Sequence, residues 1–132
     1  MLANMIILLE IVVLTVVVEV TGSHLKMSSF SYSGESVTFE CNVDHGEFPI
    51  VSITWLKDGK QFYKYDSNLI NPVSITDVDG VVVKKDLSLN GNKVTIGSVT
   101  PQSTGTYTCK VEIDHPSLSV GELSGSLKIV QN

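Results

Sequence analysis

Two cysteines and three histidines are the residues of this chain whose side chains could do the most chemistry. Cys41 and Cys109 lie far apart in the sequence, so they do not form the C-x-x-C pair of a redox enzyme. The histidines, His24, His45 and His115, are too scattered to complete a zinc site with the two thiols. In a secreted domain such a pair predicts one structural disulfide. By restricting the unfolded chain, a disulfide that closes so long a loop would stabilise the fold by about 4 kcal/mol.

No group of residues predicts catalysis. The histidines have no serine or cysteine nucleophile in a recognisable setting, and the glycines form no phosphate-binding loop. The segment 77–80, Asp-Val-Asp-Gly, lacks the further acidic ligands of a calcium loop and predicts a hairpin turn instead. Nine lysines, no arginine and fourteen acidic residues give a net charge of −5, which disfavours nucleic-acid binding. The sequence therefore predicts a protein that is not an enzyme and needs no cofactor and no metal ion.

The elements that position these residues are predicted to be short strands. Apolar residues alternate with polar ones in several runs, at 37–43, 51–55, 94–96, 107–113 and 127–129. Turn-forming pairs such as Asp58-Gly59 and Asn90-Gly91 stand between the runs. Period-two alternation is typical of strands with one buried and one exposed face. The predicted fold is therefore all-β, an antiparallel sandwich of two sheets in one domain.

The first 22 residues are predicted to be a secretory signal rather than part of this fold. From Ile6 to Val18 nearly every residue is a large aliphatic, and this run is longer than a globular strand. Glu10 and Glu19 interrupt the ~20 apolar residues that a spanning helix needs. A signal needs an apolar core of only ~7–15 residues, so cleavage after Gly22 would release residues 23–132 as a secreted, extracellular domain. The alternatives are an uncleaved membrane anchor and an internal strand, since the segment has no lysine or arginine near its start.

The spacing of Cys41, Trp55 and Cys109 resembles that of an immunoglobulin domain. Tyr107, two residues before the second cysteine, stands where such domains have the tyrosine corner. The resemblance implies an inter-sheet disulfide with Trp55 packed on it, and the long separation of the cysteines favours the variable type. Ser103 stands where the family has an aspartate that commonly pairs with an arginine, and this chain has neither partner.

A narrower resemblance covers residues 25–120. The segment WLKDGKQFYKY, residues 55–65, resembles the first domain of the beaten path family, neuronal cell-surface and secreted immunoglobulin proteins that act in axon guidance. The family usually has tyrosine where Leu56 follows the tryptophan. The resemblance implies a secreted recognition protein, in cell adhesion or axon guidance, that binds a sidestep-type receptor of the immunoglobulin superfamily and meets a membrane only through that partner. The alternative is a soluble immune or humoral binding factor without a neuronal partner.

Two places are candidates for contact with a partner. Alternation places Tyr63 and Tyr65 on one face of the strand predicted over 61–65, and Leu56 on the same outer face of the preceding strand. Tyrosine suits an interface because it offers area and a hydroxyl at low entropic cost, although these rings could equally cap the edge of the core. The predicted loop 114–118, with His115 and Pro116, is the second candidate, and a stiff turn is its plainer interpretation.

Overall fold

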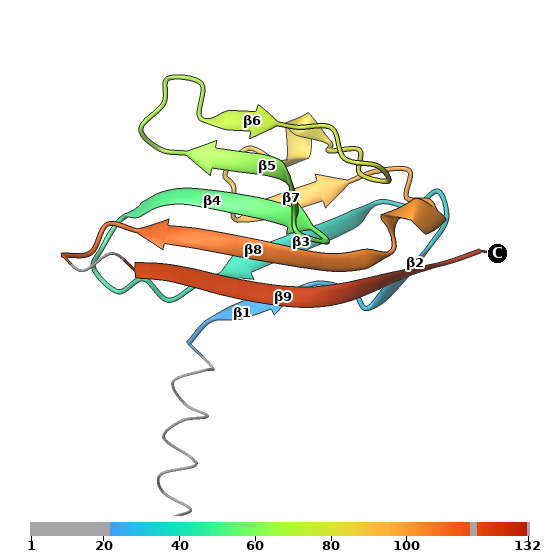
Figure 1. The fold of residues 1–132 in the computed structure, drawn as a ribbon, viewed down its shortest axis with the longest axis horizontal. Coiled ribbons are helices and arrows are strands. Elements are labelled where there is room, and N and C mark those ends of the chain that lie inside the picture. Colours follow the sequence, from blue (N-terminus) through green and yellow to red (C-terminus); the bar gives the residue numbers. More distant parts are fainter. Residues whose placement is uncertain (1–21, 117–118, 132) are drawn as a thin grey trace, which may run out of the picture.

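The computed structural model describes residues 22–116 and 119–131, which form two β-sheets packed face to face (Figure 1). The smaller sheet has the strand order β1 (His24–Lys26), β3 (Val37–Asn42) and β7 (Lys93–Ile96). The larger sheet has the order β2 (Phe30–Tyr32), β9 (Ser119–Val130), β8 (Gly105–Ile113), β4 (Ile50–Lys57), β5 (Lys60–Asp66) and β6 (Val73–Ile75). Neighbouring strands are antiparallel except β2 and β9, which are parallel. The predicted all-β sandwich is confirmed.

Alternating side chains from both sheets fill the space between them. Strand β3 buries Val37, Phe39 and Cys41, and β8 buries every second residue from Tyr107 to Ile113. The ring of Phe39 stacks on that of Tyr107, with 4.5 Å between the centroids. Burial of each large apolar side chain contributes about 1.5–3 kcal/mol. The alternation predicted from the sequence is therefore confirmed on both strands.

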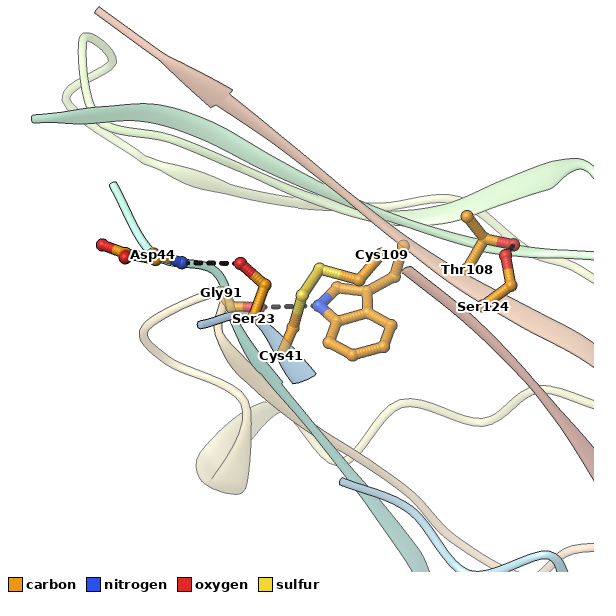
Figure 2. Close-up of a disulfide and its surroundings, with 8 residues drawn as sticks. Ser23, Cys41, Asp44, Gly91, Thr108, Cys109 and Ser124 are labelled. Carbon is orange, nitrogen blue, oxygen red and sulfur yellow. Dashed lines mark hydrogen bonds between the residues drawn. A yellow bond between two sulfur atoms is a disulfide. The ribbon is translucent and has the colours of Figure 1, made fainter. Parts of the chain in front are cut away.

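A disulfide between Cys41 and Cys109 joins β3 of the smaller sheet to β8 of the larger sheet, with 6.4 Å between the Cα atoms (Figure 2). Trp55 on β4 lies directly opposite Cys109 in the larger sheet and is fully buried. Its indole Nε1 donates a hydrogen bond of 2.6 Å to the carbonyl oxygen of Gly91, drawn as a dashed line in Figure 2. The indole thus has its one polar group satisfied while its rings add apolar bulk beside the disulfide.

A hydrogen-bonded corner closes the sandwich where the short 3-10 helix η2 (Pro101–Ser103) leads into β8. The phenol of Tyr107 donates a hydrogen bond of 2.5 Å to the carbonyl oxygen of Ser103, which is the tyrosine corner. The hydroxyl of Ser103 donates in turn to the carbonyl oxygen of Gly80, also at 2.5 Å. Ser103 therefore ties this corner to the 78–81 turn, without the aspartate–arginine pair that many variable-type domains have.

The turn between β4 and β5 is tied to β8 by Asp58. The N–H of Asp58 donates to the carbonyl oxygen of Thr106 at 2.8 Å, and its carboxylate accepts from the N–H of Thr106 at 2.9 Å. The hydrogen bond from Thr106 holds the pKa of Asp58 below its usual value, and the ammonium of Lys57, 3.4 Å away, acts in the same direction. This corner and the disulfide fix β4 and β8, the central strands of the larger sheet.

The predicted signal peptide, residues 1–22, lies outside the described residues except for Gly22, so its cleavage stays a prediction. The hydroxyl of Ser23 accepts a hydrogen bond of 2.9 Å from the N–H of Asp44 (Figure 2). The sandwich therefore already holds the chain at the first residue after the predicted cleavage point. Within residues 22–116 and 119–131, no helix has the length and apolar character needed to cross a membrane.

Candidate recognition surface

The outer face of the larger sheet is exposed to solvent, and the strand register gives its side chains. Leu56 on β4 lies between Thr108 on β8 and Gln61 on β5, and it is half-buried. Thr108 shares a hydrogen bond of 2.8 Å with Ser124 on β9 (Figure 2). Most of the other outward residues of these strands are polar, among them Thr54, Lys64, Lys110, Glu112 and Glu122, whereas Val120, opposite Glu112, is apolar and 56% exposed. Leu56 is thus the one predicted contact residue of the larger sheet that the structure places on this face.

Tyr63 and Tyr65 do not lie on this outer face, so their predicted outward placement is wrong. Tyr63 lies directly opposite Trp55, and opposed residues of a sheet point to the same side. The register shifts between Trp55 and Leu56, because a β-bulge inserts Phe62 as an extra residue in β5. Phe62 and Tyr63 are both fully buried, and Tyr65 is half-buried against the core. Strict alternation fails here because the bulge lets two successive residues point inward.

The hydroxyl of Tyr63 gives this side chain a structural role. It donates a hydrogen bond of 2.7 Å to the carbonyl oxygen of Ser88, a residue that is only 1% exposed. The hydroxyl of Ser88 accepts in turn from the N–H of Thr95 on β7, at 2.9 Å. Burial raises the pKa of Tyr63 above its usual value. Tyr63 therefore connects β5 to the smaller sheet through the interior and offers no surface to a partner.

Three loops gather at the end of the sandwich where β4 begins. Their ranges are 43–49, 67–72 and 114–118, of which residues 117 and 118 lie outside the described residues. The N–H of Asp114 donates to the carbonyl oxygen of Pro49 at 2.9 Å, and the N–H of Ser67 donates to that of Val51 at 3.0 Å. All three loops lie on the left side of Figure 1, with the loop between β5 and β6 above the other two. We call this part of the molecule, defined by these three loops, the loop end.

His115 and Pro116, the predicted contact residues of the loop 114–118, lie at the loop end. The ring of His115 packs edge-on against Phe48 from the loop 43–49, with 4.3 Å between centroids. The carbonyl oxygen of Phe48 accepts a hydrogen bond of 2.8 Å from Nδ1 of His45. Phe48 keeps 36% of its surface exposed, and Pro116 is also exposed. The ring pair therefore joins two loops while leaving part of its surface open to solvent.

The loop end also exposes apolar residues that sequence reasoning missed. Leu69 and Ile70 are 55% and 99% exposed in the loop 67–72, and Val120 at the start of β9 is 56% exposed. A signal for the first two was present, since a Leu-Ile pair stands between Asn68 and Asn71-Pro72, where turn-forming polar residues are expected. Ile70 in this turn has no role in the core, and with Leu69 it adds apolar surface at the loop end.

The loop end also carries acidic residues. The loops contain Asp44, Glu47 and Asp114, and Asp66 ends β5 directly before the loop 67–72. None of the three loops contains a lysine or an arginine. The loop end therefore combines exposed apolar surface with negative charge.

A second exposed apolar cluster, also missed from the sequence, lies at the β2 edge of the outer face. Phe30 and Tyr32 are 53% and 40% exposed, and their rings meet edge to face with 6.0 Å between centroids. They lie opposite Lys128 and Val130 of β9, so the four side chains share one face. The sequence signal was the alternation of Phe30 and Tyr32 around Ser31, which is buried.

The histidines are engaged in local contacts. Nε2 of His24 lies 3.2 Å from Nδ2 of Asn42, and His45 donates to Phe48 as described above. Among residues 22–116 and 119–131, no three His, Cys, Asp or Glu side chains come together as they would in a metal site.

Known proteins of similar fold are found among solved structures. Murine CRIg matches with a TM-score of 0.63 and 17% identity, over 82% of this chain and 98% of that chain. The V domain of amphioxus IgVJ-C2 matches with a TM-score of 0.57 and 23% identity, over 76% of this chain and 97% of that chain. Murine CEACAM1b matches with a TM-score of 0.51 and 19% identity, over 82% of this chain and 44% of that chain. At these identities the likeness concerns the fold alone.

Sequence comparison gives the family. No curated protein sequence matches the chain. The sequence profile of the immunoglobulin domain family matches residues 19–112, which is more than half of the chain and includes both cysteines and the tryptophan. The chain therefore belongs to the immunoglobulin domain family.

Proposed function

We propose that this chain is a recognition protein that binds another protein through its loop end. The observation that supports the proposal is the exposure of Phe48, Leu69 and Ile70 from two loops at one end of a rigid sandwich. Large apolar side chains that are exposed together are typical of protein-binding surfaces. The binding energy of such surfaces commonly depends on a few apolar or aromatic anchors.

The charge of the loop end indicates the chemistry of the partner. Glu47 and Asp114 lie in the loops of the loop end, Asp66 directly precedes one of them, and these loops contain no lysine or arginine. A complementary partner presents an apolar patch flanked by lysine or arginine side chains. Association with such a partner is faster at low ionic strength, because salt screens charges beyond about 10 Å at 0.1 M.

We further propose that this partner is a surface protein of the immunoglobulin superfamily and that binding takes place outside the cell, in adhesion or axon guidance. The resemblance of residues 25–120 to the beaten path family supports this proposal, and a sidestep-type receptor is the partner that the resemblance implies. The disulfide between Cys41 and Cys109 suits an oxidising exterior. Secretion is tested by expression in a secretory host, where mass spectrometry of the medium should find a chain that begins at Ser23.

A binding screen against immunoglobulin-type ectodomains tests the proposed recognition. For a captured ectodomain, Ile70→Ser should weaken binding by about 30-fold, the loss expected for truncating an anchor. Val82→Ser is a matched control, because Val82 is 61% exposed and borders Gly80 and Gln102 rather than the loop end. The control should bind with unchanged affinity in surface plasmon resonance.

Two other results would change the proposed binding surface or the proposed class of partner. Unchanged affinity in both Leu69→Ser and Ile70→Ser would exclude the loop end, and a loss in Leu56→Lys would then assign binding to the outer face. A chain that binds no immunoglobulin-type ectodomain but binds a soluble or microbial ligand would favour the humoral alternative.

A further inference from the structure

Strand β6 forms one edge of the larger sheet and pairs only with β5. The N–H of Asp66 donates to the carbonyl oxygen of Pro72 at 2.8 Å, and the N–H of Thr76 donates to that of Phe62 at 3.0 Å. Hydrogen-bonded and non-hydrogen-bonded pairs alternate along an antiparallel ladder. The even-numbered residues from 72 to 76 therefore direct their backbone groups toward β5.

The odd-numbered residues, Val73 and Ile75, direct their N–H and C=O groups away from β5, to the open edge. No backbone hydrogen bond joins these groups to any other described residue. Natural proteins commonly block an open edge with a lysine, a proline or a bulge within the strand. Strand β6, with the sequence Val-Ser-Ile, has none of these and is protected only by its short length.

A groove of about 390 Å³ borders this open edge. Its lining residues come from β6 and from the segment around the 3-10 helix η1 (Lys85–Leu87): Val73, Ile75, Lys85, Ser88 and Leu89. Leu89 is 63% exposed, so the groove offers apolar surface beside the unpaired backbone groups. Lys85 lines the groove and Asp86 stands next to it in η1, so both signs of charge lie near the groove, and neither residue forms an ion pair with a described residue.

We propose that two copies of this chain pair along this edge, β6 against β6, in an antiparallel dimer with two-fold symmetry. When Ser74 of each copy lies opposite that of the other, Val73 of one copy faces Ile75 of the second copy. These residues direct their backbone groups outward, so each such pair exchanges both N–H···O bonds. The strand is thus complementary to itself, as a two-fold interface requires.

The side chains and charges at the edge are also self-complementary. Val73 and Ile75 point to the core side of the sheet, because they lie opposite Tyr65 and Tyr63. In the dimer they and Leu89 of both copies form one continuous apolar layer. Each copy also carries Lys85 in the groove and Asp86 next to it, and a two-fold axis allows the lysine of one copy to meet the aspartate of the other.

The dimer has a consequence for recognition. Pairing of β6 with β6 joins the two larger sheets into one, so the outer faces of both copies lie on the same side. The two loop ends point in opposite directions, because the paired strands are antiparallel. A dimer can therefore hold two partner molecules at once, one at each end, and link partners displayed on two opposed surfaces.

Sedimentation equilibrium of the full chain tests this proposal, and we expect a monomer–dimer equilibrium between low micromolar and about 1 mM chain. Ile75→Pro removes an outward N–H without removing a bond to β5, and Leu89→Lys places a charge in the groove. Each variant should weaken dimerisation by about tenfold or more. Val82→Lys is the matched control, since Val82 is 61% exposed but lies outside the groove, and it should leave the equilibrium unchanged.

Thermal unfolding of each variant shows whether the domain stays folded. If Ile75→Pro fails to fold, Leu89→Lys still gives an answer, because a side chain that is 63% exposed contributes little to the core. A chain that stays monomeric over the whole concentration range would overturn the proposal. A dimer that Leu89→Lys and Val82→Lys weaken equally would also overturn it. Neither result bears on partner binding at the loop end, which Ile70→Ser tests separately.

Discussion

The buried hydroxyl of Tyr63 gives this residue a role in the stability of the fold. Its ring is fully buried and its hydroxyl donates to the carbonyl oxygen of Ser88. Tyr63→Phe keeps the ring but leaves this buried carbonyl without its partner, so we expect the free energy of unfolding to fall by about 1–3 kcal/mol in urea titrations. Tyr32→Phe, at a tyrosine that is 40% exposed, is the control and should change stability very little. Weaker partner binding with unchanged stability in Tyr63→Phe would contradict this role.

The same buried phenols predict how stability depends on pH. Burial raises the pKa of both Tyr63 and Tyr107 above the usual value of about 10. The fold therefore favours the neutral phenols, and their contribution is complete below pH ~10 and is lost as the pH rises further. We expect the denaturant midpoint to fall steeply above pH ~10. The fall should be shallower in Tyr63→Phe than in Tyr32→Phe, and equal pH profiles for the two variants would contradict the prediction.

At the level of elements, the 78–81 turn depends on a glycine. Gly80 has φ = +80°, and a Cβ at this position would clash with the backbone oxygen of Gln102. Gly59 has φ = +81° but nothing within 4 Å of its missing Cβ, so Gly59→Ala measures the backbone strain alone. We expect Gly59→Ala to cost about 1–2 kcal/mol and Gly80→Ala to cost clearly more, measured by thermal unfolding. Equal losses would show that the contact with Gln102 relaxes freely.

The elements also show how far the sequence determines the fold and the site. Strands β3 and β8 were predictable because one residue in two is apolar and no bulge interrupts them. The inward placement of Tyr63 was not predictable, because it follows from the bulge at Phe62, whose ring packs against Tyr107 in the interior, and not from a local sequence pattern. The exposure of Leu69 and Ile70 could have been predicted from their place in a turn, but only the fold brings their loop to the same end of the sandwich as Phe48 and His115.

At the level of the whole molecule, one sandwich carries three different surfaces. The loop end is acidic and exposes apolar side chains, whereas the outer face surrounds Leu56 with polar groups. The β6 edge exposes backbone groups instead of side chains, so it suits a second copy of the same strand. Each of the three surfaces includes strands of the larger sheet or loops that begin or end at its strands, and β4 and β8 lie at the centre of that sheet.

The disulfide cross-links the larger sheet to the smaller sheet. Its removal tests how much of the stability of the whole molecule depends on this bond. Cys41 and Cys109 are 3% and 0% exposed. Replacing both with alanine removes the disulfide without leaving one free thiol behind. Loss of a native disulfide in a small secreted domain typically costs about 2–5 kcal/mol, and we expect Cys41→Ala/Cys109→Ala to lose stability in that range. Guanidinium titrations followed by tryptophan fluorescence measure the loss, because Trp55 lies directly opposite Cys109. In the unaltered chain, a thiol reagent should find no free cysteine even after denaturation without a reductant. Reactive thiols in that experiment, or a double variant as stable as the original chain, would show that the two sheets are held together by packing alone.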